Sequence, residues 1–167
     1  MDNAWKTVLW PQFGAAIDML ENAVIACPDT LWSDRSRNPE FWYIDFHALF
    51  FLDFSLADSP LGFAPPDPFT LDELDPEGAL PRRPYGQEEI RTFLRQGREK
   101  GRNAIETLSE ERSTEPSSFL GGDVTVLEFF LCNMRHIQHH AAQLNLILRQ
   151  KTDSAPGWVR RAGTASP

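Results

Sequence analysis

The sequence predicts an all-α fold, namely a four-helix bundle in up-down-down-up order built from a single domain that covers 1–167. Four long segments repeat apolar residues at the three-to-four spacing of a helix, and no segment shows the two-residue period of a strand. Seven of the chain's 13 prolines lie between the second and third of these segments, where they exclude an extended helix. A hydrophobic content of 41% is enough for a full core without disulfides.

The first helix is predicted over 11–26, where isoleucine, leucine and valine recur at helical spacing. Residues 5–10 are a candidate extension of this helix toward the N-terminus, with Pro11 as a break or kink. The helix should end before Pro28, because the residue that precedes a proline avoids helical geometry.

The second helix is predicted over 39–58, with Asn38 as its cap and Pro39 in its first position. The proline-rich connection over 59–86 follows, and within it the stretch 71–74 allows one short turn. A connection of this length is expected to carry the chain from one end of the bundle to the other, so that the second and third helices run parallel.

The third helix is predicted over 87–108, with an apolar stripe that faces inward. Gly97 and Gly101 belong to this stripe and are four residues apart. They either weaken the middle of the helix or let a neighbouring helix approach closely, and we favour the close approach.

The fourth helix is predicted over 125–151, starting at a capping box formed by Thr125 and Glu128 and ending in basic residues that suit the helix dipole. The remaining residues, about 152–167, form a turn-rich C-terminal tail. Trp158 is expected to dock this tail on the bundle, with its last residues frayed.

Composition excludes several classes of function. The formal net charge of −8 argues against nucleic-acid binding, which needs a basic face, and the basic stretch 82–102 contains acidic residues that mark a solvated helix surface. No uncharged, proline-free stretch of about 20 residues exists to span a membrane, and no signal peptide is visible. Cys27 and Cys132 are expected to be buried free thiols, which suits a cytoplasmic location.

The four histidines lie within the two most apolar helical segments. His136 and His140 are four residues apart, so they share one inward face of the fourth helix, while His139 falls on its flank. His47 lies on an inward face of the second helix. Because His47 and the His136–His140 pair each lie near the middle of their helix, they are expected at the same height whichever way the helices run.

Three neutral imidazoles that meet in an apolar cavity suit a divalent ion such as zinc, nickel, iron or copper. Three protein ligands leave positions open for water or substrate, as in catalytic rather than structural sites. The competing interpretation is that each histidine is an ordinary hydrogen-bonded core residue, but each would then need its own buried partner. Two known metal-binding motifs do not match. The zincin motif needs glutamate at the position of Ile137, and the di-iron bundle motif needs glutamate at the position of Asn133.

The helical stretch FWYIDFHALFFLDF, the connection GFAPPDPFTLDELD and the segment NMRHIQHHAAQLNL followed by APGWVRRA resemble the DinB-like (DinB/YfiT-type) metalloenzyme superfamily over nearly the whole chain. The family's three metal ligands correspond to His47, His136 and His140. The resemblance implies a homodimer and a divalent ion, most often nickel or zinc, with iron as an alternative. It also implies relatives that transfer low-molecular-weight thiols.

Two hypotheses follow. The first is a metal-dependent enzyme that acts on a small molecule, either a hydrolase or a transferase that uses a thiol as cosubstrate. The sequence does not identify a catalytic residue for it. Three polar residues near the histidines either contact the metal ligands or the substrate or have no function, namely Asn133, Gln143 and Tyr43. Four nearby phenylalanines either belong to the core or line a substrate pocket, namely Phe50, Phe51, Phe54 and Phe129. The second is a non-catalytic dimeric binding or stress protein with a vestigial or empty site. Aromatic and apolar residues around the second helix are expected to form part of a subunit interface, and they include Phe41, Trp42, Phe46 and Leu49.

Overall fold

The computed structural model describes residues 4–119 and 122–163. In these two ranges the chain is all-helical, and its only extended pairing is an isolated bridge between Pro116 and Thr125. The prediction of an all-α chain is therefore confirmed. None of the helices in these ranges is long and apolar enough to cross a membrane.

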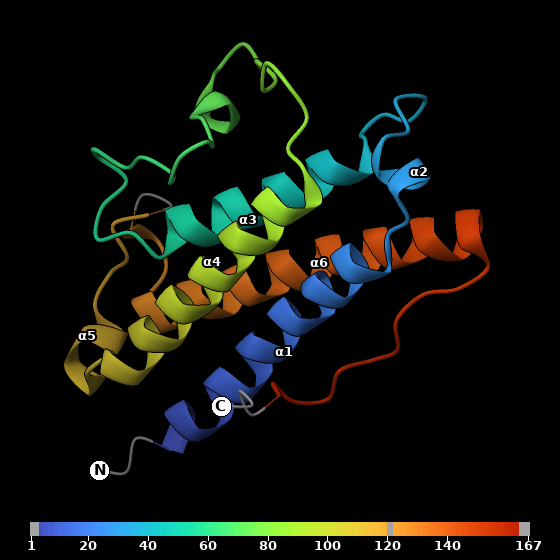
Figure 1. Cartoon of the computed structure of the whole chain (residues 1–167). Helices are drawn as coiled ribbons and strands as arrows, with labels where there is room; N and C mark the ends of the chain where they lie inside the picture. Colours follow the sequence, from blue (N-terminus) through green and yellow to red (C-terminus); the bar gives the residue numbers. More distant parts are fainter. Residues whose placement is uncertain (1–3, 120–121, 164–167) are drawn as a thin grey trace.

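Four long helices build the core and each packs against two of the others. Helices α1 and α3 both contact α4 and α6. Figure 1 shows α1 and α6 running in one direction and α3 and α4 in the other. The bounds of these four are α1 Ala4–Ala26, α3 Phe41–Ser55, α4 Gln87–Thr107 and α6 Val126–Thr152. Three short elements join them, α2 Asp29–Trp32, the 3-10 turn η1 Asp72–Leu74 and α5 Glu110–Thr114.

Helix α1 includes the candidate extension, since it begins at Ala4, and it continues through Pro11 without a break. A proline inside a helix removes one backbone hydrogen bond and costs about 3 kcal/mol. The helix is nevertheless held by the burial of apolar residues on both sides of the proline, among them Leu9, Phe13 and Ile17. Burial of these side chains outweighs the local preference for a break.

Helix α3 is shorter than predicted at both ends, since it runs from Phe41 to Ser55 with Glu40 as its N-cap residue. Asn38 and Pro39 lie outside the helix. The Glu40 carboxylate does not cap the helix but accepts hydrogen bonds from Arg35 at 2.6 Å and from the Trp42 indole. A tertiary contact with the preceding loop has therefore replaced the predicted local cap.

The connection between α3 and α4 folds over α3, as Figure 1 shows, and its single turn η1 is where the sequence predicted one. Phe69 and Tyr85 of this connection pack on Phe46, with ring centroids 5.9 and 4.9 Å away. As a result the apolar residues expected at a subunit interface are all buried inside the chain, at 5% exposure or less, namely Phe41, Trp42, Phe46 and Leu49. That prediction was wrong because the sequence did not reveal that the connection covers this face.

The two glycines of α4 serve close packing. A Cβ atom at Gly97 would lie 2.9 Å from Cδ2 of Leu52, and one at Gly101 would lie 3.4 Å from side-chain atoms of Leu56 and Phe13. The interpretation that these glycines admit a neighbouring helix is confirmed, and α4 contacts both α3 and α1.

Helix α6 begins where it was predicted, with the Thr125 hydroxyl accepting a hydrogen bond from the Glu128 N–H at 3.2 Å. The other half of the predicted capping box, a bond from the Thr125 N–H to the Glu128 side chain, is absent from the described residues. The C-terminal segment then crosses α1, where the Gln12 side chain donates to the Arg160 carbonyl at 3.1 Å and Ala162 N–H donates to the Pro11 carbonyl at 2.8 Å. Trp158 does not dock this segment, since it is 69% exposed. The predicted fraying of the last residues concerns 164–167, which lie outside the described residues.

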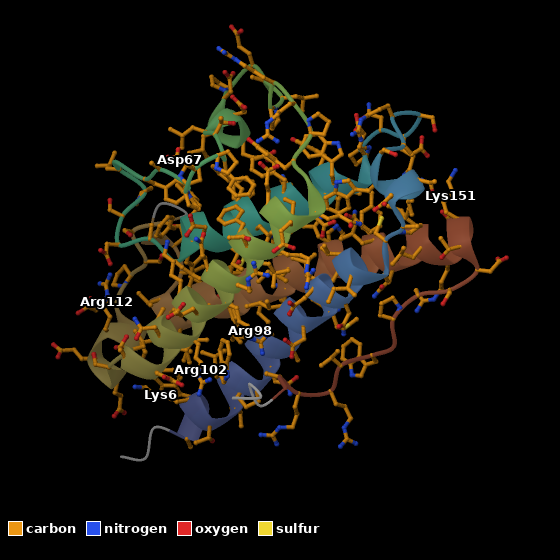
Figure 2. The ribbon with its side chains drawn as sticks, in the orientation of Figure 1. Lys6, Asp67, Arg98, Arg102, Arg112 and Lys151 are labelled. Atoms are coloured by element: carbon orange, nitrogen blue, oxygen red, sulfur yellow. The ribbon has the colours of Figure 1, made fainter. Side chains whose placement is uncertain are left out.

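The basic stretch 82–102 is only partly the solvated surface that was predicted, since Arg83 and Arg102 are exposed whereas Arg98 is half-buried. Arg83 and Glu89 make a two-pronged ion pair, with N···O distances of 2.8 and 2.6 Å. Arg98 and Arg102 lie between α4 and α1 (Figure 2), where both guanidinium groups stack over Trp10 at 5.7 and 5.8 Å from the ring centroid. These cations are engaged within the protein.

Asp45 is a charged residue type in the middle of the core. It is fully buried on α3, and neither carboxylate oxygen has a hydrogen-bond partner in the part of the chain that the structure describes. Burial disfavours the charged form and raises the pKa of the Asp45 carboxyl well above its ordinary value. The group is therefore protonated in the folded chain at pH values where the unfolded chain has released the proton.

We expect Asp45→Asn to raise the free energy of unfolding, and to do so more at pH 8 than at pH 4. Because the pKa of Asp45 is higher in the folded than in the unfolded chain, its protonation stabilises the fold fully at pH values below the pKa of the unfolded chain. This stabilisation is lost as the pH rises through the pKa of the folded chain. Asparagine has the same shape without the ionisation, so the variant should lose this part of the pH dependence. Urea titrations at both pH values measure the effect, with the exposed Asp58→Asn as control. Identical pH dependence in the variant and the wild type would contradict the assignment.

Candidate metal centre

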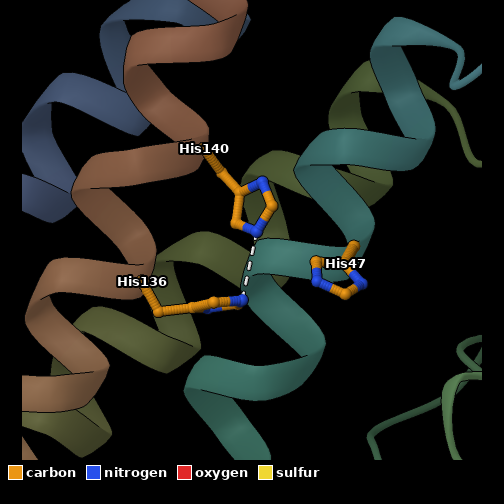
Figure 3. A group of neighbouring side chains, drawn as sticks. All are labelled: His47, His136 and His140. Atoms are coloured by element: carbon orange, nitrogen blue, oxygen red, sulfur yellow. Dashed lines mark hydrogen bonds between the residues drawn. The ribbon is translucent and has the colours of Figure 1, made fainter.

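Two antiparallel helices bring three histidines together. His47 comes from α3, and His136 and His140 come from α6. Their ligand nitrogens all lie within 4.8 Å of one another, and all three side chains are half-buried. Figure 3 shows the three rings facing a common point between the two helices. The three sequence-predicted residues are thus close enough to bind one ion.

The pair on α6 is already spaced for shared coordination. Its Nε2 atoms are 3.0 Å apart. A zinc ion lies about 2.0–2.1 Å from each imidazole nitrogen, which places two such ligands roughly 3 Å apart. The rings of the pair are crossed at 77° and share a hydrogen bond between their Nε2 atoms, so one turn of helix brings both nitrogens to the same place, where an ion would replace the shared proton.

The environment keeps the two α6 imidazoles neutral. Burial, with the nearby charges of His140, His47 and His139, lowers the pKa of His136 from its ordinary value to about 4. Burial also lowers the pKa of His140, although its hydrogen bond to Gln143 opposes this. Because a metal ligand must be deprotonated, both side chains are ready to bind an ion at neutral pH.

Two polar side chains hold the outer nitrogens of the site. The Nδ1 atom of His47 lies 2.6 Å from a carboxylate oxygen of Glu73, and the Nδ1 atom of His140 lies 2.8 Å from Oε1 of Gln143. Each contact leaves Nε2 available toward the centre. Such partners commonly fix the orientation of ligand histidines and raise their basicity.

Glu73 was not identified from the sequence. It lies on η1 in the proline-rich connection, and its side chain is only 4% exposed. The single turn was predicted, but the sequence offers several acidic residues there and no signal for which of them reaches α3. The contact depends on how the whole connection folds over the helix.

Tyr43 belongs to the same cluster. Its ring lies 6.4 Å from that of His47, between centroids. Burial, a hydrogen bond with Glu73 and the charge of that carboxylate all raise the pKa of the Tyr43 hydroxyl above its ordinary value. Tyr43 therefore keeps its proton, next to the carboxylate that contacts His47.

His139 is not part of the triad, as its position on the helix flank predicted. Its side chain is exposed and its Nε2 lies 3.1 Å from the Gln143 amide nitrogen. It provides a natural control for substitutions of the ligand pair, because it is adjacent to His140 and of the same chemical type.

A cavity of about 360 Å³ opens beside His47 and His136. Its other walls are mostly aromatic, formed by Phe51, Phe54, Phe119 and Phe129, with Ser55, Cys132 and Asn133 completing it. Of the phenylalanines considered in the sequence, Phe50 is core and the other three line the cavity. Cys27 is buried as predicted, whereas Cys132 is exposed because it lies at this opening.

We expect Glu73→Gln to weaken metal binding by about 10–100-fold, the usual cost of losing an outer partner of a ligand histidine. Helicity should be retained, because the substitution keeps the side-chain shape. Competition against a chromogenic chelator measures the affinity. Glu77→Gln is the matched control, since Glu77 is exposed on the same connection and its carboxylate has no hydrogen-bond partner among the described residues. Equal affinities for the two variants would show that Glu73 does not support the site.

Comparisons of the chain with protein-family models, curated proteins and solved structures gave no significant match. Function must therefore be inferred from the geometry of the histidine cluster and the cavity beside it. The family resemblance drawn from the sequence motifs remains a prediction.

Proposed function

We propose that the protein is a metal-dependent enzyme of the DinB-like type, in which His47, His136 and His140 hold one divalent ion. The observation that carries this proposal is the convergence of three half-buried imidazole nitrogens next to an apolar cavity. In this proposal the four long helices are an up-down-down-up bundle, and the connection between α3 and α4 is the crossover that delivers Glu73.

The donor set fits nickel or zinc, with iron as an alternative, because all three ligands are imidazole nitrogens. A bound divalent ion lowers the pKa of a water or thiol that it holds. The chain supplies three ligands, which leaves room for such a molecule. Glu73 and Gln143 hold two of the imidazoles in a fixed orientation, and the cavity beside them has mostly aromatic walls.

The reaction we propose is the transfer of a small thiol to an electrophilic carbon. The thiolate sulfur forms a bond to that carbon, the leaving group departs with its electron pair, and the thiol proton passes to solvent. An apolar cavity beside the ligands suits this chemistry because a desolvated thiolate is a stronger nucleophile. No side chain of the chain is assigned as a nucleophile.

A conjugation assay tests this activity. Untagged protein is incubated with 1-chloro-2,4-dinitrobenzene and, in turn, cysteine, glutathione and other small thiols, and product absorbance is followed. We expect faster conjugation with nickel- or zinc-loaded protein than with metal-free protein or with His136→Ala. The same rate with and without the metal would contradict the transferase proposal, and would favour a non-catalytic binding protein if the ion is bound stoichiometrically.

Homodimerisation and a cytoplasmic location remain predictions that follow from the resemblance and the composition. The residues first expected at the interface are buried within the chain, so a dimer would have to use another surface. Sedimentation velocity of the untagged protein measures the oligomeric state directly, and a purely monomeric protein at micromolar concentration would contradict the dimer.

A further inference from the structure

The cavity beside the histidines has the character of a ligand site rather than of a packing defect. Its volume, about 360 Å³, lies within the range of small-molecule pockets, and such pockets combine apolar walls with few polar groups. Phe119 and Phe129 are stacked with centroids 5.1 Å apart, and Phe54 meets Phe119 edge-on at 5.1 Å. These rings pack against one another and hold the walls in place, which favours a flat aromatic guest.

A buried amide side chain in the wall has no hydrogen-bond partner in the part of the chain that the structure describes. Asn133 is 4% exposed, and neither its amide nitrogen nor its amide oxygen has a hydrogen-bond partner among the described residues. Buried amides are nearly always satisfied in native proteins, because an unmet donor or acceptor loses its hydration without compensation. Asn133 borders both this cavity and a second one of about 400 Å³, so its side chain lies in the wall between the two.

The position of Asn133 relates it to the proposed chemistry. It precedes His136 by three residues on α6, and residues three apart are neighbours on a helix surface. A guest that met the Asn133 amide while lying against Phe51 or Phe129 would also lie beside His47 and His136, which border the same cavity.

We infer that this cavity binds an aromatic molecule bearing a carboxamide or a similar donor-and-acceptor group, which Asn133 recognises. The aromatic walls take the ring, and the Asn133 amide offers one donor and one acceptor to the polar group. The interpretation of this cavity as a substrate pocket rests on the proposed function. Binding of the aromatic molecule itself needs no metal.

Fluorine NMR with two matched probes tests the inference on metal-free, untagged protein. 4-Fluorobenzamide carries the carboxamide, and 4-fluorotoluene has a similar shape without it. We expect line broadening to show saturable binding of both at concentrations on the order of millimolar, with the benzamide bound more tightly. Asn133→Leu should weaken benzamide binding about ten-fold and leave toluene binding unchanged or tighter.

Asn145→Leu is the matched control, because Asn145 is also a buried α6 asparagine with an unpartnered Oδ1 but does not line the cavity. Its benzamide affinity should equal that of the wild type. Equal affinity of wild type and Asn133→Leu for 4-fluorobenzamide, or no saturable binding of either probe to wild-type protein, would overturn the inference. The comparison of the two probes on wild-type protein decides the matter if a variant fails to fold. Because these experiments use metal-free protein, a negative result would not bear on the proposed metal site, which the metal-binding measurements test separately.

Discussion

Replacing His136 with alanine is expected to abolish stoichiometric binding of nickel or zinc while the helical circular dichroism spectrum is retained. The variant keeps only two of three converging imidazoles. Loss of a ligand should exceed the roughly 10–100-fold effect of losing an outer partner. The helix itself should survive, because alanine is the best helix former and His136 is only half-buried at the edge of the cavity.

His139→Ala is the control for this result, since it removes an exposed imidazole from the same turn of α6 and leaves the three converging nitrogens in place. Its metal content should match that of the wild type after gel filtration and elemental analysis. Stoichiometric metal in His136→Ala, or equal loss in both variants, would show that the ion is held elsewhere.

Phe46→Ala is expected to lower the free energy of unfolding by about 3–5 kcal/mol, the range for removing a fully buried aromatic side chain. Phe46 has no exposed surface, and its ring packs against Phe50, Phe69 and Tyr85. Because small proteins are stable by only about 5–15 kcal/mol, the loss is large. Urea denaturation followed by circular dichroism measures it.

The same substitution should also weaken metal binding. Two of the rings that pack on Phe46 belong to the connection that carries Glu73, so a cavity there loosens the element that orients His47. Leu61→Ala is the control, because Leu61 is 87% exposed on the same connection and its loss should change stability by less than about 0.5 kcal/mol. A cost below about 1 kcal/mol for Phe46→Ala would show that the connection is not anchored on this ring.

The parts of the fold that could be predicted are those set by local sequence. The apolar period located the four long helices, and Thr125 marked the start of α6 because a cap depends on residues three apart. The spacing of His136 and His140 placed both on one helix face, and the midpoints of the helices placed His47 at the same height. These inferences needed only helix geometry.

The parts that could not be predicted depend on contacts between distant segments. Pro11 stays helical because Leu9 and Phe13, on either side of it, are buried in the core. Glu40 contacts Arg35 and Trp42 instead of capping α3, and although these residues are close in sequence, their spacing does not show which contact Glu40 makes. Glu73 reaches His47, and Phe119 reaches Phe129, only because loops return to the helices. No local pattern records where a long connection comes to rest, and so these partners of the site became visible only in the structure.

Elemental analysis of wild-type protein, purified without a histidine tag and then offered nickel and zinc in turn, tests the central claim most directly. We expect about one divalent ion per chain, held through gel filtration, because three ligand nitrogens already lie within 4.8 Å of one another. Protein that neither retains nor takes up either ion would contradict it, and the three histidines would then be polar residues of an ordinary helical core.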